Sequence, residues 1–157
     1  MEADGLWLSL LFVASMIPFI EYTLAVPVGI LFVNQPPVLT VLVSILGNSL
    51  GVMLLVLLSE KIRDWTLKRQ NSQKSGRQSS KQQEKTKHFL EKYGMPGVGI
   101  LAPILLSSHI GAVTAVALGV SRSYAILWTL IGVVLWAIIF GIICVYASHW
   151  LLPFFGQ

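Results

Sequence analysis

The stretch that decides the fold of this chain is residues 38–59, VLTVLVSILGNSLGVMLLVLLS. Its 22 residues include no Asp, Glu, Lys or Arg. At about 1.5 Å of rise per residue, a helix over this stretch crosses a hydrocarbon core about 30 Å thick. A second uncharged stretch of the same kind covers residues 124–147. We therefore expect two full transmembrane helices, at 38–59 and 124–147.

The charged residues of the chain are few and are concentrated in one segment. Of the 157 residues, 55% are hydrophobic and 11% are charged, against about 25% charged in an average soluble domain. Ten of the eleven Lys and Arg residues lie between Lys61 and Lys92. Segments in contact with lipid are nearly uncharged, so this distribution predicts an integral membrane protein with one basic loop, 61–92. The positive-inside rule places this loop in the cytoplasm.

Several other classes of protein do not fit this composition. The basic loop is rich in Gln and Ser without interleaved aromatic residues, so we expect no nucleic acid partner and a mobile loop centre at 70–83. Cys144 is the only cysteine, and His88, His109 and His149 lack the spacing of metal ligands. No arrangement typical of an active site is present. We expect no enzyme activity, no metal and no cofactor.

Two further apolar blocks, 6–33 and 95–120, are interrupted near their centres. Proline inside a helix removes a backbone hydrogen bond, and irregular backbone at membrane depth occurs only where protein or water surrounds it. The interrupting residues are Pro18, Glu21 and Pro27 in the first block, and Pro103, Ser107, Ser108 and His109 in the second. We expect each block to be a re-entrant helical hairpin with a polar elbow; a single kinked span is the alternative.

The chain then has two halves with the same plan. The first repeat covers 1–60 and the second covers 93–157, on either side of the loop 61–92. An offset of 85 residues aligns Pro18 with Pro103 and Gly47 with Gly132. With hairpins in both halves, the first half starts outside and the second starts in the cytoplasm, which makes an inverted-topology repeat with both termini outside. In transporters of this architecture the site lies at the broken helices, so we expect a site between the two elbows, lined by their prolines.

Glu21 is the only acidic residue between Gly5 and Ser59. An ionised carboxylate in a membrane is costly, and burial favours its neutral form. Such a group can take up a proton on one side and release it on the other, or it can pair with a cationic substrate. The alternative is that Glu21 caps the second half of the hairpin by accepting backbone N–H bonds. The two roles are compatible.

The second elbow contains Ser107, Ser108 and His109. The two hydroxyls and the imidazole are suited to hydrogen-bonding a substrate headgroup, and His109 is suited to relaying protons. The alternative is that Ser107 or Ser108 caps the helix that follows. In that case His109 has a structural role, and its hydrogen bonds are made within the protein.

Small and polar residues at other positions suggest contacts between helices. Asn48 follows Gly47 in the first span, where it can support helix packing or contact substrate. Gly47, Ser49 and Gly51 form a small-residue face, which suggests a homodimer. Arg122 is suited either to lipid phosphate or to anchoring at the cytoplasmic face.

With these residues in view, the chain resembles the small multi-drug export protein family of prokaryotes, which is distantly similar to the DedA membrane proteins. Three segments carry the resemblance: Pro18-Phe-Ile-Glu21-Tyr-Thr-Leu-Ala-Val-Pro27-Val-Gly29, Leu46-Gly47-Asn48, and Lys92-Tyr93-Gly94 followed by the elbow from Pro103 to Gly111-Ala112. The resemblance implies a multi-pass protein of a prokaryotic plasma membrane that exports small molecules. Thr23 stands where the family usually has Arg, so a Glu–Arg pair is missing here.

Three functions follow from these observations. The first is a proton-coupled exporter of amphipathic or cationic small molecules, with Glu21 as the coupling carboxylate. The second, implied by the DedA resemblance, is a translocase of lipid or lipid-carrier phosphate, whose headgroup the positive ends of the half-helices would favour. The third is a membrane protein that transports nothing and binds a cytoplasmic partner through its loop.

Overall fold

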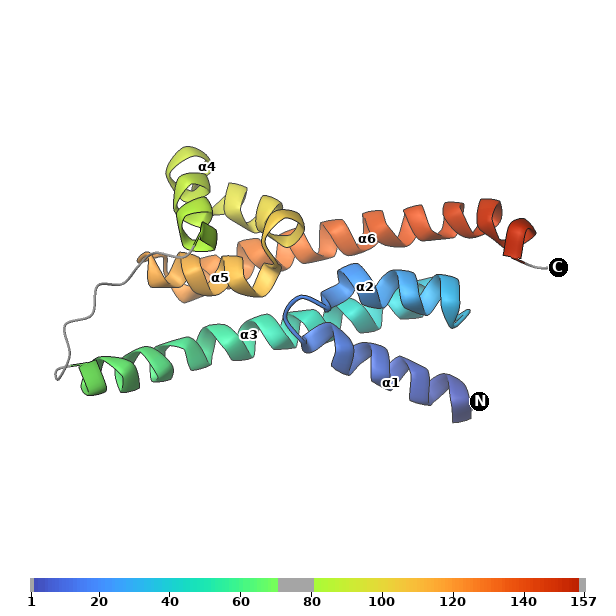
Figure 1. Ribbon diagram of the computed structural model, residues 1–157, viewed down its shortest axis with the longest axis horizontal. Helices are drawn as coiled ribbons and strands as arrows, with labels where there is room; N and C mark the ends of the chain where they lie inside the picture. Colours follow the sequence, from blue (N-terminus) through green and yellow to red (C-terminus); the bar gives the residue numbers. More distant parts are fainter. Residues whose placement is uncertain (1, 71–80, 156–157) are drawn as a thin grey trace. The chain divides into compact units, whose positions relative to one another are not determined.

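Every regular element in the computed structural model is a helix, over the described residues 2–70 and 81–155 (Figure 1). The expected all-α architecture is confirmed. In chain order the helices are α1 (Glu2–Met16), α2 (Glu21–Pro27), the π-helix η1 (Val28–Phe32), α3 (Pro37–Gln70), α4 (Lys81–Leu105), α5 (Ser108–Ala117) and α6 (Arg122–Phe155). The predicted mobile loop centre falls mainly on residues 71–80, which lie outside the described residues.

The two longest helices, α3 and α6, contain the two stretches that the sequence identifies as membrane spans. The segments Pro37–Ser59 and Arg122–Ser148 are long and apolar enough to cross a bilayer. Only 33% and 28% of their most apolar windows are buried, whereas the core helix of a soluble protein is mostly buried. Their exposed faces carry large apolar side chains, among them Leu42, Leu46, Leu50, Leu127, Leu135 and Ile142. Such faces suit contact with lipid.

The chain divides into two compact units, and the boundary falls within both α3 and α6. Unit 1 comprises the residues up to Gly51 and those from Gly132 onward, and unit 2 comprises Val52–Ile131. In unit 1, α1 packs against α2 and η1. The core of this unit is formed by α2 and η1 through Tyr22, Val26 and Ile30, and by α6 through Val133, Ala137 and Cys144, with Val41 and Ile45 of α3 packed against them.

Two glycines of unit 1 lie where helices come close together. A Cβ atom at Gly47 of α3 would meet the backbone carbonyl oxygen of Phe12 in α1. A Cβ atom at Gly141 of α6 would lie 2.6 Å from Cγ2 of Val41 in α3. Small residues let membrane helices approach closely. Both of these glycines lie in contacts between helices of the same chain. The homodimer stays a prediction, and it requires surfaces other than these two positions.

Unit 2 is built around α4 and α5, which pack against each other. A kink at Gly94 (φ 68°, ψ −170°) divides α4, in a backbone conformation that is open to glycine and rarely to other residues. Gly111 of α5 lies against Ala102 of α4, where an added Cβ atom would come within 2.5 Å of the alanine Cβ. Buried apolar residues of both helices, including Val98, Ala112 and Ala115, form the core with Val52 and Val56 of α3.

Both interrupted blocks are broken in the structure. The first break is a turn at residues 17–20, between α1 and α2. The second lies at residues 106–107, between α4 and α5, where Ser107 has a φ of 103°. Of the residues expected to interrupt this block, Ser107 lies in the break, whereas α4 continues through Pro103 to Leu105. It ends where the N–H groups of Leu106 and Ser107 both donate to the carbonyl of Ala102, at 2.8 and 2.9 Å.

The order of the elements repeats along the chain. A packed pair of helical segments, α1 with α2 and η1, is followed by the long helix α3, and a second pair, α4 with α5, is followed by α6. The loop predicted for 61–92 is helical at both ends, since α3 extends to Gln70 and α4 begins at Lys81. Lys, Glu and Gln are good helix formers, which accounts for this difference. Re-entry of the two pairs and the inverted orientation of the halves stay predictions.

Candidate functional site

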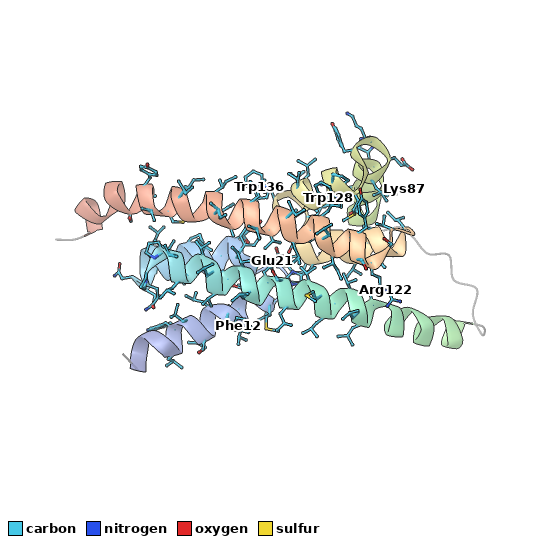
Figure 2. The ribbon with its side chains drawn as sticks, turned by 180° about the vertical axis from the view of Figure 1, so that it is seen from behind. Phe12, Glu21, Lys87, Arg122, Trp128 and Trp136 are labelled. Carbon is cyan, nitrogen blue, oxygen red and sulfur yellow. The ribbon has the colours of Figure 1, made fainter. Side chains whose placement is uncertain are left out.

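Glu21 lies at the first break, where the backbone is strained. It is the first residue of α2, in unit 1, and is labelled in Figure 2. Only 1% of its surface is exposed. Its φ is 44°, and that of Phe19 two residues earlier is 77°. Non-glycine residues in this left-handed region cost about 1 kcal/mol or more, and such strain is concentrated at functional sites. The break thus holds the only acidic side chain of this block inside the unit.

The capping alternative for Glu21 can be compared with the local geometry. The N-cap position of α2 is Ile20, which makes no side-chain capping hydrogen bond, and Glu21 occupies the first helical position. The Glu21 N–H donates to the carbonyl of Ile17 at 3.2 Å. Glu21 is therefore not the N-cap residue itself. Its carboxylate belongs to the first turn, where the partial positive charge of a helix N-terminus favours an anion.

The prolines of the first block flank this acid. Pro18 lies in the turn before α2, and Pro27 lies at the end of α2. Pro27 has no N–H to donate, and the chain continues from it as the π-helix η1, in which the Val33 N–H donates to the Val28 carbonyl at 3.0 Å. π-helical turns are rare and are frequent at functional sites. Thr23 donates its hydroxyl to the Ile20 carbonyl at 3.2 Å.

A row of buried polar side chains follows one face of α3. Thr40, Ser44 and Asn48 are spaced by four residues, and all three are fully buried. Thr40 lies next to η1, because a Cβ atom at Gly29 would come within 2.5 Å of Cγ2 and 3.3 Å of Oγ1 of Thr40. Sequence reasoning identified Asn48 but missed Thr40 and Ser44. The four-residue spacing of polar residues in an otherwise apolar helix is the signal by which they could have been found.

The second elbow belongs to unit 2. Ser108 and His109 are buried, and the Ser108 Oγ lies 3.3 Å from Nδ1 of His109, within hydrogen-bond distance. Ser107 is the N-cap residue of α5, but its side chain makes no capping hydrogen bond, and its carbonyl accepts the Gly111 N–H at 3.0 Å. Of the two serines, Ser108 is therefore the one that lies next to the imidazole.

The other predicted site residues take different positions. Pro103 is buried inside α4, and Arg122 is exposed at the start of α6. Gly47 lies against α1, as described above. Among the described residues, no group of three or more His, Cys, Asp or Glu side chains is placed to hold a metal ion.

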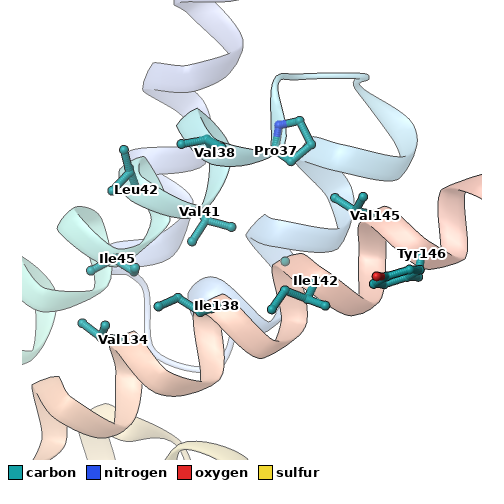
Figure 3. Close-up of a pocket in the computed structure, with 11 residues that line it drawn as sticks. Pro37, Val38, Val41, Leu42, Ile45, Val134, Ile138, Ile142, Val145 and Tyr146 are labelled. Atoms are coloured by element: carbon teal, nitrogen blue, oxygen red, sulfur yellow. The ribbon is translucent and has the colours of Figure 1, made fainter.

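An apolar groove runs between α3 and α6 in unit 1 (Figure 3). Its volume is about 640 Å³, within the range of about 300–1,000 Å³ that is usual for sites of small molecules. The lining residues come from the start of α3 (Pro37, Val38, Val41, Leu42, Ile45) and from α6 (Val134, Ile138, Gly141, Ile142, Val145, Tyr146). The lining is apolar apart from the Tyr146 hydroxyl, so the groove suits the apolar part of a ligand.

Comparison with known proteins gives one finding. A family model described as "Putative small multi-drug export protein" matches residues 21–139. The match begins at Glu21 and includes the polar row, the second elbow and the first half of α6. No curated protein and no solved structure matches the chain.

Proposed function

Since the chain belongs to the small multi-drug export protein family, we propose that it is a proton-coupled exporter of amphipathic or cationic small molecules, with Glu21 as the coupling carboxylate. Membership of this family and the two long apolar helices make it a membrane protein of an export family. Proton coupling, the substrate class and the site are the proposal.

The burial of Glu21 carries this proposal. An ionised side chain at the centre of a membrane helix costs about 2.5–3.5 kcal/mol on insertion scales, and such residues commonly mark substrate or ion pathways. Ser or Asn would cap a helix at lower cost. A buried carboxyl group can exist in a neutral protonated form and in a charged form that attracts a cation, so proton binding and cation binding compete at one group. That competition is the simplest basis for exchange of a proton against a cationic substrate.

The groove between α3 and α6 supports an amphipathic substrate. It belongs to the same unit as Glu21 and offers apolar side chains on both walls. An amphipathic cation has an apolar body for such a groove and a charge for a carboxylate. His109, buried beside Ser108, is proposed as a second proton-binding group within unit 2.

The proposed topology has the two helix pairs as re-entrant hairpins of an inverted repeat in a prokaryotic plasma membrane. The basic segment 61–92 is cytoplasmic, and both termini are outside. Single cysteines near residue 3, in the loop and near the C-terminus, in a Cys144→Ala background, can be treated with an impermeant maleimide in intact cells. We expect labelling at the two ends only; labelling of the loop alone would contradict the arrangement.

The experiment that tests the coupling role uses Glu21→Gln, which keeps the size of the side chain and removes its charge. Glu84→Gln is the matched control, because Glu84 is an exposed carboxylate in α4. Both variants and the wild type are reconstituted in liposomes with an imposed proton gradient, and uptake of a cationic dye and internal pH are followed together. We expect Glu21→Gln to insert normally but to lose at least tenfold in gradient-driven dye transport, with Glu84→Gln unchanged.

Two results would contradict the coupling role. Transport and pH dependence of Glu21→Gln that match the wild type would leave Glu21 without a part in coupling. Failure of Glu21→Gln to insert, while Glu84→Gln inserts, would assign Glu21 a structural role.

A lipid translocase is the second candidate, and the groove is the observation that favours it. Its walls are apolar, and exposed large side chains such as Leu42 and Ile142 line it, which also suits an acyl chain. The test is a fluorescent phospholipid in the same liposomes, with dithionite quenching of the outer leaflet. Accelerated flipping that needs no proton gradient would favour this function over the first.

A further inference from the structure

The apolar groove between α3 and α6 follows the length of both helices within unit 1. The parts of α3 and α6 that belong to this unit run in opposite directions (Figure 1). In Figure 3, Ile45 and Val134 lie at one end of the groove, and Pro37 and Tyr146 lie at the other. The start of the α3 span and the end of the α6 span therefore meet at the same end of the groove.

This arrangement gives the groove a defined depth in the bilayer. Pro37 is the first residue of the apolar segment of α3, and Tyr146 lies two residues before Ser148, the last residue of the apolar segment of α6. This end, the shallow end, is therefore near the membrane surface. At about 1.5 Å per residue, the groove extends about 12 Å along α3 to Ile45 and about 18 Å along α6 to Val134. Half of a hydrocarbon core about 30 Å thick is about 15 Å, so the groove spans one leaflet.

The groove is open to lipid along its length. Gly141, on its floor, has no side chain, and a Cβ atom there would lie 2.6 Å from Cγ2 of Val41 on the opposite wall. Exposed apolar side chains of both walls lie beside this floor: Val38 and Leu42 of α3, and Ile138 and Ile142 of α6. They belong to the exposed apolar faces of the two spans. The groove is therefore continuous with the surface by which α3 and α6 contact lipid.

Packing favours a chain in this groove over a chain elsewhere on the two helices. Lipid tails are as apolar as leucine, so no hydrophobic effect drives a tail onto a membrane helix. An alkyl chain in the groove contacts protein atoms on both walls and on the floor, whereas a chain on a convex helix surface contacts them on one side. Each additional contact contributes dispersion energy, and an unfilled groove would lose it.

The width of the groove suits an alkyl chain better than a helix. Its volume of about 640 Å³, divided by its length of about 18 Å, gives a mean cross-section of about 36 Å². A helix with its side chains is about 10–12 Å across, which corresponds to about 80–110 Å². A second copy of the chain could therefore place side chains in the groove, but not a helix.

We propose that the groove binds one acyl chain of a bilayer phospholipid, with the end of the chain at Ile45 and Val134 and the headgroup at the shallow end. Tyr146 fits this orientation, because tyrosine is favoured at the level of lipid headgroups. In the proposed topology the lipid belongs to the outer leaflet. The site itself requires only that α3 and α6 lie in a membrane. Its consequence for transport rests on the proposed function: an amphipathic substrate that uses the groove has to displace the acyl chain.

The first test counts the lipids that stay bound to the protein and does not depend on transport. Wild type and variants are reconstituted in vesicles of phosphatidylethanolamine and phosphatidylglycerol, extracted into mild detergent and analysed by native mass spectrometry. Ile142→Trp fills the groove. Ile143→Trp is the matched control, because Ile143 is exposed to the same extent (56% against 54%) and does not line the groove. We expect one phospholipid per chain in the wild type and in Ile143→Trp, and at least fivefold less in Ile142→Trp.

A second pair of variants tests the opposite wall. Leu42→Trp fills the groove from α3, and its control is Leu39→Trp, since Leu39 is 47% exposed against 50% for Leu42 and does not line the groove. This pair decides the question if Ile142→Trp does not insert. Equal retention of lipid by the groove variants and their controls would overturn the site, and so would a wild type that retains no lipid.

The second test locates the chain. A phospholipid with a diazirine at the end of one acyl chain is illuminated in the vesicles, and the labelled residues are identified by mass spectrometry. We expect at least fivefold more labelling at Ile45 and Val134 than at Leu135, an exposed neighbour that does not line the groove. Equal labelling of Leu135 would overturn the site. Cross-linking of two copies through Ile142→Cys, in a Cys144→Ala background, would assign the groove to a second copy of the chain instead.

A third measurement separates the lipid site from the proposed function. A saturating amount of a transported cationic amphipathic dye should lower the diazirine labelling of the groove at least threefold. Undiminished labelling in the presence of this dye would leave the lipid site intact and contradict the groove as part of the substrate site. Loss of the lipid site in the first two tests, with transport that still depends on Glu21, would overturn the lipid site alone.

Discussion

Replacement of Gly47 by alanine tests how α1 and α3 pack in unit 1. The sequence alone suggests that Gly47 lies in an interface between two copies of the chain. In the structure it lies against α1 of its own chain, and a Cβ atom there would meet the Phe12 carbonyl oxygen. Because this oxygen belongs to the backbone, it cannot move away by rotating a side chain. The two helices would have to separate to admit the methyl group.

The size of the effect follows from two opposing terms. Alanine is favoured over glycine inside a helix by about 1 kcal/mol, whereas overpacking in a close contact costs about 1–3 kcal/mol. A clash with backbone is at the upper end of that range. We therefore expect Gly47→Ala to lower the free energy of unfolding by about 1–2 kcal/mol, a factor of about 5–30 in the unfolding equilibrium.

Gly5→Ala is the matched control for this change. Gly5 is in α1, and a Cβ atom there would have no neighbour within 4 Å. It should therefore leave the free energy of unfolding unchanged or raise it by up to about 1 kcal/mol. Reversible unfolding in mixed micelles with increasing SDS, followed by tryptophan fluorescence, measures both variants.

The comparison has a clear contrary outcome. A Gly47→Ala variant as stable as Gly5→Ala would show that α1 does not cross α3 at this position. A variant that unfolds normally but loses its partner copy would instead return Gly47 to an interface between protomers.

Four further predictions concern other parts of the chain. Tyr22→Phe keeps the edge-on packing against Phe140, whose ring centroid is 6.1 Å away, and removes a buried hydroxyl that has no hydrogen-bond partner among the described residues. The free energy of unfolding should therefore stay the same or rise by up to about 1 kcal/mol. Ile142→Trp narrows the groove, so KM for a bulky amphipathic dye should rise severalfold while that for a small cation does not. Ser108→Ala removes the hydroxyl 3.3 Å from His109 and should lower the free energy of unfolding by about 1–3 kcal/mol in the SDS assay. Native mass spectrometry in nanodiscs should show two copies; a single copy that transports would contradict the homodimer.

Much of the architecture could be predicted from the sequence, because it depends on local properties of the chain. The spans at 38–59 and 124–147 follow from length and absence of charge, and α3 and α6 contain both. The break before Glu21 follows from Pro18 and from an acid in an apolar block. Glu21 could be identified as a candidate for the same reason, because the sequence alone shows that it is the only carboxylate in this apolar block.

The contacts of individual residues were decided only by the tertiary structure. The second break lies at 106–107, within the predicted elbow, but α4 continues through Pro103 to Leu105, so the proline alone does not mark where the helix ends. The spacing of Thr40 and Ser44 is visible in the sequence, but hydroxyls in such helices commonly bond to their own backbone. The contact of Thr40 with Gly29 depends on how η1 packs on α3. The neighbour of each small residue depends on how two segments pack together. It therefore cannot be predicted from the sequence of either segment alone.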